Sequence, residues 1–110
     1  MRQLNITKTP TPAQQAEAAE ALRWLEQQPL PVGCPTELYT EYLAPNFRFI
    51  ISLASQYQNQ GLSLAELVTA GHAAAIACIV RHGERTEKLT DWLAWWVRQG
   101  MLEAVQKKPT

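Results

Sequence analysis

The sequence predicts an all-α fold, a compact bundle of about five helices. Apolar residues recur at intervals of three to four along most of the chain, and no segment alternates apolar and polar residues as a strand does. Hydrophobic residues make up 46% of the 110 residues and charged residues 18%, which is the composition of one globular domain with a modest core. Prolines and glycines interrupt the periodicity at a few positions and so mark where helices end.

The first helix is predicted to begin at Pro12, with Thr11 as its cap. Residues 13–28 are almost wholly good helix formers. Residues 29–35 contain three prolines and a glycine, which forbid a helix and form a stiff connector. We therefore divide the chain into an N-terminal helix with a proline-rich linker, a helical domain and a frayed tail, at residues 1–35, 36–106 and 107–110.

Two more helices are predicted in the next part of the chain. Thr36 caps the first of them, and Pro45 must break or kink it. Beyond Pro45, apolar residues follow helical spacing on a wide face from Phe47 to Tyr57, so this helix is expected to be central and largely buried. Gly61 suits the left-handed conformation that often ends a helix.

The fourth helix is predicted to open with a capping box formed by Ser63 and Glu66. Small residues dominate its middle, from Ala70 to Ala77, and they would let another helix approach closely. Gly83 is expected to end this helix, and a short charged segment then leads to the last one.

The last helix, from Thr90 to Val105, carries three of the four tryptophans and has two apolar stripes. The first stripe consists of Leu89, Leu93, Val97, Met101 and Val105, and the second of Trp92, Trp95, Trp96 and Gln99. One apolar face is enough to dock a helix. The tryptophans therefore either join a thick core or form a surface for nucleic-acid bases or for another protein.

The charge balance limits the kinds of partner. Ten basic and ten acidic side chains give a net charge of zero and a pI near 6.7, so the chain has no global attraction to nucleic acid. Any DNA binding would have to be local, weak or assisted by a larger partner. We find no apolar run of roughly 18 residues and no signal-peptide core, which predicts a cytoplasmic chain without a membrane segment.

Motifs of enzymes and metal sites are not found in the sequence. His72 and His82 are ten residues apart and have no cysteine or carboxylate at ligand spacing, so we expect no metal, no cofactor and no catalytic residue. His72 is interpreted instead as a polar surface residue or an interhelical residue. Cys34 and Cys78 are expected to be free thiols, with Cys78 as a small core residue.

Two segments resemble region 2 of the sigma-70 family of transcription initiation factors. These are NFRFIISLASQYQNQGLSLAEL, residues 46–67, and WLAWWVRQ, residues 92–99; the opening MRQLNITK also resembles the start of some primary sigma factors. The resemblance implies a helix, a glycine turn, a helix that grips the clamp of RNA polymerase, and an aromatic helix that captures the opened promoter. It implies a transcription protein that has no enzymatic activity.

The resemblance also implies which residues contact each partner. For DNA, Trp92 stands where the family has a tyrosine that stacks on the flipped adenine of the −10 element, Trp95 and Trp96 match a tryptophan pair, and Gln99 matches a glutamine implicated in −10 contacts. Arg98 matches a basic residue near the DNA backbone, and Lys88 completes the expected DNA-binding set. The residues expected to contact the polymerase clamp are Glu66, Thr69, His72 and Ile76.

Departures from the family pattern reduce the expected contacts. The family's Gln-Glu-Gly-Asn is Thr69, Ala70, Gly71 and His72 here, and Glu87 and Asp91 add carboxylates that repel phosphate. We therefore predict a regulatory or degenerate module of the region 2 type that binds RNA polymerase, single-stranded −10 DNA or both, and that cannot direct full initiation alone. The alternative is a helical interaction module that binds another sigma, an anti-sigma factor or itself through the tryptophan face, without DNA.

Overall fold

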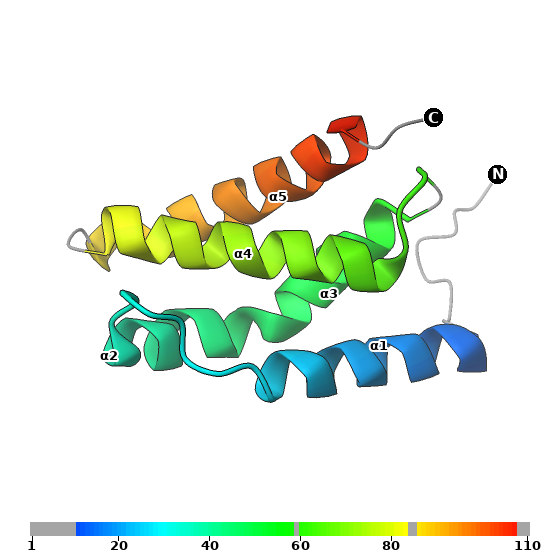
Figure 1. Cartoon of the computed structure of the whole chain (residues 1–110), viewed down its shortest axis with the longest axis horizontal. Helices are drawn as coiled ribbons and strands as arrows, with labels where there is room; N and C mark the ends of the chain where they lie inside the picture. The colour runs from blue at the N-terminus through cyan, green and yellow to red at the C-terminus, as the bar shows by residue number, and fades with distance from the viewer. Residues whose placement is uncertain (1–10, 59, 84–85, 108–110) are drawn as a thin grey trace, which may run out of the picture.

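The computed structural model describes residues 11–58, 60–83 and 86–107 (Figure 1). Within these ranges the chain is helical and contains no strand, which confirms the predicted all-α class. The α-helical segments are α1 (Pro12–Glu26), α2 (Thr36–Leu38), α3 (Phe47–Gln56), α4 (Leu64–His82) and α5 (Leu89–Lys107). Because α2 continues into α3 through the short turns η2 (Tyr39–Leu43) and η3 (Ala44–Asn46), they form one bent rod. A final short turn, η4 (Thr86–Lys88), precedes α5.

Helix α4 is the centre of the bundle. It packs along α5 on one side and against α3 and α1 on the other, as Figure 1 shows. Although it contains no unbroken apolar run, α4 is long and apolar enough by length and mean composition to cross a membrane, and 44% of this stretch is buried inside the bundle. The physical reason is its central position, since a helix surrounded by other helices is apolar on most of its circumference.

Helix α1 is held by the cap that the sequence predicts. The Thr11 hydroxyl accepts a hydrogen bond from the backbone N–H of Gln14, and the Gln14 side chain accepts one from the N–H of Thr11. The helix buries Ala21 and Leu25 and contacts both α3 and α4. Residues 27–35 follow as a connector, in which Gly33 has a φ of 85°.

The rod from Thr36 to Gln56 shows how the chain accommodates Pro45. Tyr39 to Leu43 form a π-helical turn, and Pro45 lies in the 3₁₀ turn that follows, so the proline bends the helix without ending it. The expected cap at Thr36 is wrong, because Thr36 is already helical and its side chain makes no capping bond. Helix α3 buries a wide apolar face, as predicted, but α4 and not α3 is the central helix, because α4 packs against α1, α3 and α5. The end of α3 leads to Gly61, which has a φ of 98°.

The capping box of α4 is also confirmed. The Ser63 hydroxyl accepts from the Glu66 N–H at 3.1 Å, and a Glu66 carboxylate oxygen accepts from the Ser63 N–H at 2.8 Å. Farther along α4, small residues bring α5 very close: a Cβ added to Gly100 would lie 2.6 Å from Cβ of Ala74. A Cβ added to Gly71 would lie 2.6 Å from Cε of Met101. The predicted close approach of another helix to α4 is therefore present.

Candidate nucleic-acid and polymerase surfaces

The two stripes predicted on α5 have different environments. Four members of the first stripe, Leu89, Leu93, Val97 and Met101, are buried in the core. Of the tryptophans, Trp95 is 57% exposed, whereas Trp92 and Trp96 are half-buried and pack against the core. The core interpretation is therefore correct for Trp92 and Trp96, whereas Trp95 faces solvent and remains a candidate for the surface interpretation.

His82 joins the tryptophans from the last turn of α4. Its ring centroid lies 4.0 Å from that of Trp92 and 5.7 Å from that of Trp96, with both pairs edge to face. The rings of Trp95 and Trp96 are also edge to face, at 6.4 Å. The sequence analysis did not assign His82 to this surface. His82 could have been assigned to this surface from the sequence, because the connection between α4 and α5 is short and places the end of one helix beside the start of the next.

The polar residues expected to contact DNA lie around Trp95. Gln99 is one turn beyond Trp95 and half-exposed, and Arg98 is exposed beside it. Lys88 is exposed at the end of the turn before α5. Asp91 is exposed one turn before Trp95 and puts a negative charge on the same face. This surface thus combines an open aromatic side chain with charges of both signs.

The residues expected to contact polymerase are divided between the surface and the interior of α4. Glu66 and Thr69 are exposed, and Ile76 is half-buried. The Thr69 hydroxyl donates to the carbonyl oxygen of Ala65 at 2.8 Å. His72 is only 6% exposed, so of its two interpretations the interhelical one is correct, and its ring is not presented to a polymerase.

His72 lies in an aromatic cluster that joins four helical segments, α1, η2, α3 and α4. Its Nε2 is 3.0 Å from the hydroxyl oxygen of Tyr39, and the two groups share a hydrogen bond. The ring centroids of Trp24, Tyr39 and Phe47 lie 5.8, 6.1 and 6.3 Å from that of His72. The polar ring is thus paired inside the fold, as a buried polar group requires.

Burial of His72 makes the stability of the fold depend on pH. It lowers the pKa of the imidazole below its ordinary value of 6.5. As the pH falls through this ordinary value, the unfolded chain binds a proton that the folded chain does not. We therefore expect the full free energy of unfolding above pH 6.5 and a decline as the pH falls towards the folded-state pKa. Urea unfolding at about pH 7.5 and about pH 5.5 measures the difference.

The variant His72→Phe is the control for this pH dependence. It removes the titrating ring and keeps an aromatic side chain at the site. We expect the wild-type protein to lose more stability between the two pH values than His72→Phe does. An equal loss in both proteins would assign the pH dependence to other groups.

Both cysteines are buried and unpaired, as predicted. Burial raises the pKa of the Cys78 thiol to about 11 and also raises the pKa of the Cys34 thiol. Both are therefore protonated near neutral pH, the form in which a thiol is a poor nucleophile. Among the residues that the structure describes, no group of three or more His, Cys, Asp or Glu side chains is arranged to hold a metal ion.

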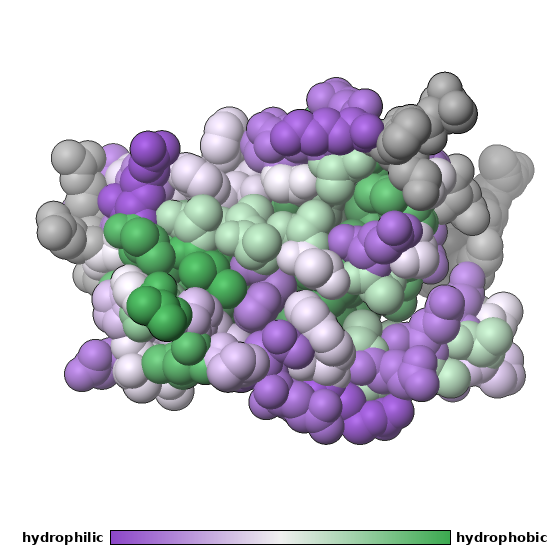
Figure 2. All heavy atoms as spheres, in the orientation of Figure 1, coloured by the Kyte–Doolittle hydropathy of each residue, from purple (hydrophilic) through white to green (hydrophobic). Residues whose placement is uncertain are grey.

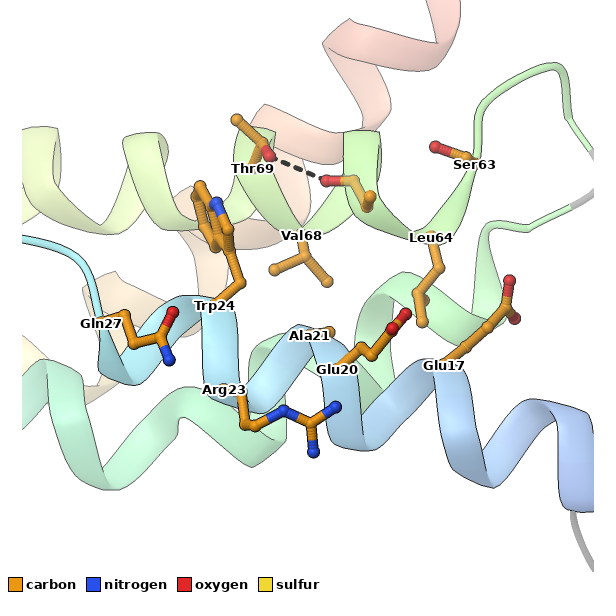
Figure 3. Close-up of a pocket in the computed structure, with 11 residues that line it drawn as sticks. Glu17, Glu20, Ala21, Arg23, Trp24, Gln27, Ser63, Leu64, Val68 and Thr69 are labelled. Carbon is orange, nitrogen blue, oxygen red and sulfur yellow. Dashed lines mark hydrogen bonds between the residues drawn. The ribbon is translucent and has the colours of Figure 1, made fainter.

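A groove that the sequence analysis did not identify separates α1 from the first half of α4 (Figure 3). It has a volume of about 450 Å³. Residues of α1 and of the start of α4 line it, among them Glu17, Glu20, Trp24, Leu64, Val68 and Thr69. It could not be inferred from periodicity, because it exists only where two helices distant in sequence diverge.

Comparisons with known proteins point to transcription factors. The chain is 33% identical over 67 residues to RNA polymerase sigma factor SigA4 of Synechococcus elongatus, an alignment that covers 60% of this chain and 22% of that protein. It is 31% identical over 61 residues to SigA of Nostoc, covering 54% and 16%. It is 32% identical over 62 residues to the chloroplastic sigD of Arabidopsis thaliana, covering 56% and 15%.

These alignments span less than a quarter of the length of each relative. No protein-family model matches the chain, and no solved structure matches it. Over somewhat more than half of its length, the chain is therefore similar to RNA polymerase sigma factors, a similarity that is consistent with a divergent sigma-70 region.

Proposed function

We propose that this protein acts in transcription as a module of the sigma region 2 type that binds RNA polymerase and single-stranded −10 DNA. The observation that carries the proposal is the position of Trp95. Its side chain is 57% exposed on a helix whose opposite stripe is fully occupied by the core. An open aromatic ring stacks on an unpaired base, and stacking is worth roughly 1 to 3 kcal/mol per base.

The DNA-binding surface in this proposal consists of Trp95 with Gln99, Arg98 and Lys88. Trp92 and Trp96 lie beside this surface and pack on the core and on His82. The nearby carboxylate of Asp91 reduces the electrostatic attraction to phosphate. Binding to DNA is thus expected to be weak, and to be strongest when the protein is held on a larger partner.

The polymerase-binding surface in this proposal is the outward side of α4. Thr69, Ile76 and Val80 follow one another at helical spacing on that side, and Val80 is 55% exposed. Figure 2 shows apolar surface gathered over the C-terminal part of α4 and the connector before α2, where Val32 is also fully exposed. An exposed apolar patch of this kind marks a site of protein contact.

Binding of the purified protein to core RNA polymerase tests the proposal. We expect saturable binding that competes with an intact sigma region 2, and we expect Val80→Asp to weaken it because a charge would be buried at the contact. Glu103→Ala, at an exposed position of α5, is the control variant. No binding at protein concentrations of about tens of micromolar would contradict the polymerase role, since specific contacts of this class are tighter.

A second function is supported by the same apolar patch and by the net charge of zero. In this alternative the protein binds another sigma, an anti-sigma factor or itself, and does not bind DNA. The dependence on salt distinguishes the two functions. DNA binding weakens steeply as salt is added, whereas an apolar protein contact does not.

A further inference from the structure

Helix α1 is the least buried of the four long helices. It buries two residues, Ala21 and Leu25, whereas α3, α4 and α5 bury five, eight and four. The groove described above also separates α1 from the first half of α4. Local opening of a protein begins where few apolar contacts oppose it. Of these helices, α1 is therefore the one that can leave the bundle most easily, with the connector 27–35 as its hinge.

An aromatic contact joins α1 to the middle of α4. The ring centroids of Trp24 and His72 lie 5.8 Å apart, with the two rings edge to face. Tyr39 and Phe47 also pack against the imidazole, and both are buried, whereas Trp24 is 37% exposed and lines the groove (Figure 3). Water can therefore reach His72 with the least loss of packing from the α1 side.

The hydrogen-bond partner of His72 is an uncharged group. Its Nε2 lies 3.0 Å from the Tyr39 hydroxyl, whose pKa is raised by burial, so the phenol stays neutral at and below neutral pH. Burial is also the cause of the lowered pKa of the His72 imidazole. A phenol can accept a hydrogen bond from an imidazolium, but it cannot balance the charge. A proton on His72 would therefore leave a positive charge enclosed without a counter-charge.

The charged side chains of the surrounding elements lie at the surface. On α1, Glu20 precedes Trp24 by one turn and its carboxylate is directed towards α4, whereas the Arg23 guanidinium lies on the other side of α1 (Figure 3). Cys34, in the connector, is a buried thiol whose raised pKa keeps it neutral. The other exposed charges are Glu17 and Glu26 on α1, Glu37, Glu41 and Arg48 on the rod, and Glu66 on α4. Because water screens exposed charges, none of them replaces a buried counter-charge for His72.

We propose that α1 is a strap that leaves α4 when His72 binds a proton. The released histidine is hydrated and binds a proton with its ordinary pKa of 6.5, whereas the enclosed one does so only at lower pH. Release is therefore favoured as the pH falls through 6.5 and is opposed above it. Helices α3, α4 and α5 also pack against one another, so the rest of the bundle stays assembled while α1 is away.

The strap controls access to one face of α4. Leu64 and Val68 are buried and line the groove beside α1, and His72 follows one turn later on the same side of the helix. Release uncovers these three side chains and so creates an apolar surface that is open only in acid. The release follows from the packing of the bundle and is independent of the proposed function.

Amide hydrogen exchange of the full chain at about pH 7.5 and about pH 5.5 tests the strap, with each protection factor referred to the intrinsic exchange rate at that pH. We expect the amides of residues 21–25 to be less protected than the core amides of α4 at both pH values. We also expect their protection to fall by up to about tenfold at the lower pH, the factor by which a histidine of ordinary pKa favours the open state across this range.

Two histidine variants show which group binds the proton. In His72→Phe the protection of α1 should be the same at both pH values, because the enclosed titrating group is gone. His82→Phe should retain the fall, since His82 lies in the last turn of α4 against Trp92 and Trp96. If His72→Phe does not fold, His72→Gln takes its place, because an amide also offers Tyr39 a hydrogen bond and does not titrate.

Three results would overturn the proposal. Equal protection of α1 and α4 would show that α1 leaves only when the whole bundle unfolds. A lower protection of α1 that does not change with pH would show that α1 leaves without exposing His72. A fall that persists in the variant without the imidazole would assign the proton to another group.

Discussion

Trp95→Ala is expected to weaken binding to a single-stranded TATAAT-type oligonucleotide by about 5- to 150-fold, which corresponds to the loss of one stacked base. The side chain is 57% exposed and carries little of the core, so the helical content and the melting temperature should change little. Fluorescence anisotropy of a labelled oligonucleotide at low salt measures the affinity. Low salt is needed because the net charge of the chain is zero.

Two other tryptophan variants make this result specific. Trp24→Ala removes an exposed tryptophan on α1, away from the proposed DNA surface, and should leave the affinity for the oligonucleotide unchanged. Trp96→Ala should instead lower the stability, because Trp96 packs on the core and on His82. If Trp95→Ala binds the oligonucleotide as well as the wild type does, Trp95 is not the stacking residue and the alternative of a protein interaction module gains support.

Gly100→Ala is expected to lower the free energy of unfolding by about 1 to 3 kcal/mol, although alanine is the better helix former. The new Cβ would lie 2.6 Å from Cβ of Ala74 and 3.4 Å from the carbonyl oxygen of Ala70. Neither atom belongs to a flexible side chain, so α4 and α5 would have to move apart along their contact. Urea unfolding followed by circular dichroism measures the effect.

Two comparisons isolate the helix contact as the cause. Gly71→Ala should cost less than Gly100→Ala, because its nearest neighbour is Cε of Met101, the movable end of a flexible side chain. Adding Ala74→Gly to Gly100→Ala should return part of the lost stability by restoring the space between the helices, a coupling that a double-mutant cycle measures. A net stabilisation by Gly100→Ala would show that helix propensity outweighs the contact.

The elements of this fold are encoded in short stretches of sequence. Thr11 and Ser63 cap their helices through bonds to residues three positions away, and such bonds depend only on local spacing. The buried stripe of α5 from Leu89 to Met101 follows from helical periodicity alone. The cap predicted at Thr36 failed because the helix starts one residue earlier than the local pattern suggests.

The exposure of residues beside the core was decided by the tertiary structure. His72 lies inside the bundle because Trp24, Tyr39 and Phe47 surround it from three segments, and no local pattern brings these together. Trp95 is open and its neighbour Trp96 is covered because His82 reaches one ring and not the other.

The sequence alone therefore determined where the helices run and which face of each is apolar, since both follow from bonds and spacings within a few residues. It also carried the similarity to sigma factors. Only the tertiary structure decided which tryptophan is accessible, that His72 is enclosed, and that α1 and α4 leave a groove between them. The physical reason is that accessibility depends on which distant segment packs against a face, and that choice is made by the whole bundle.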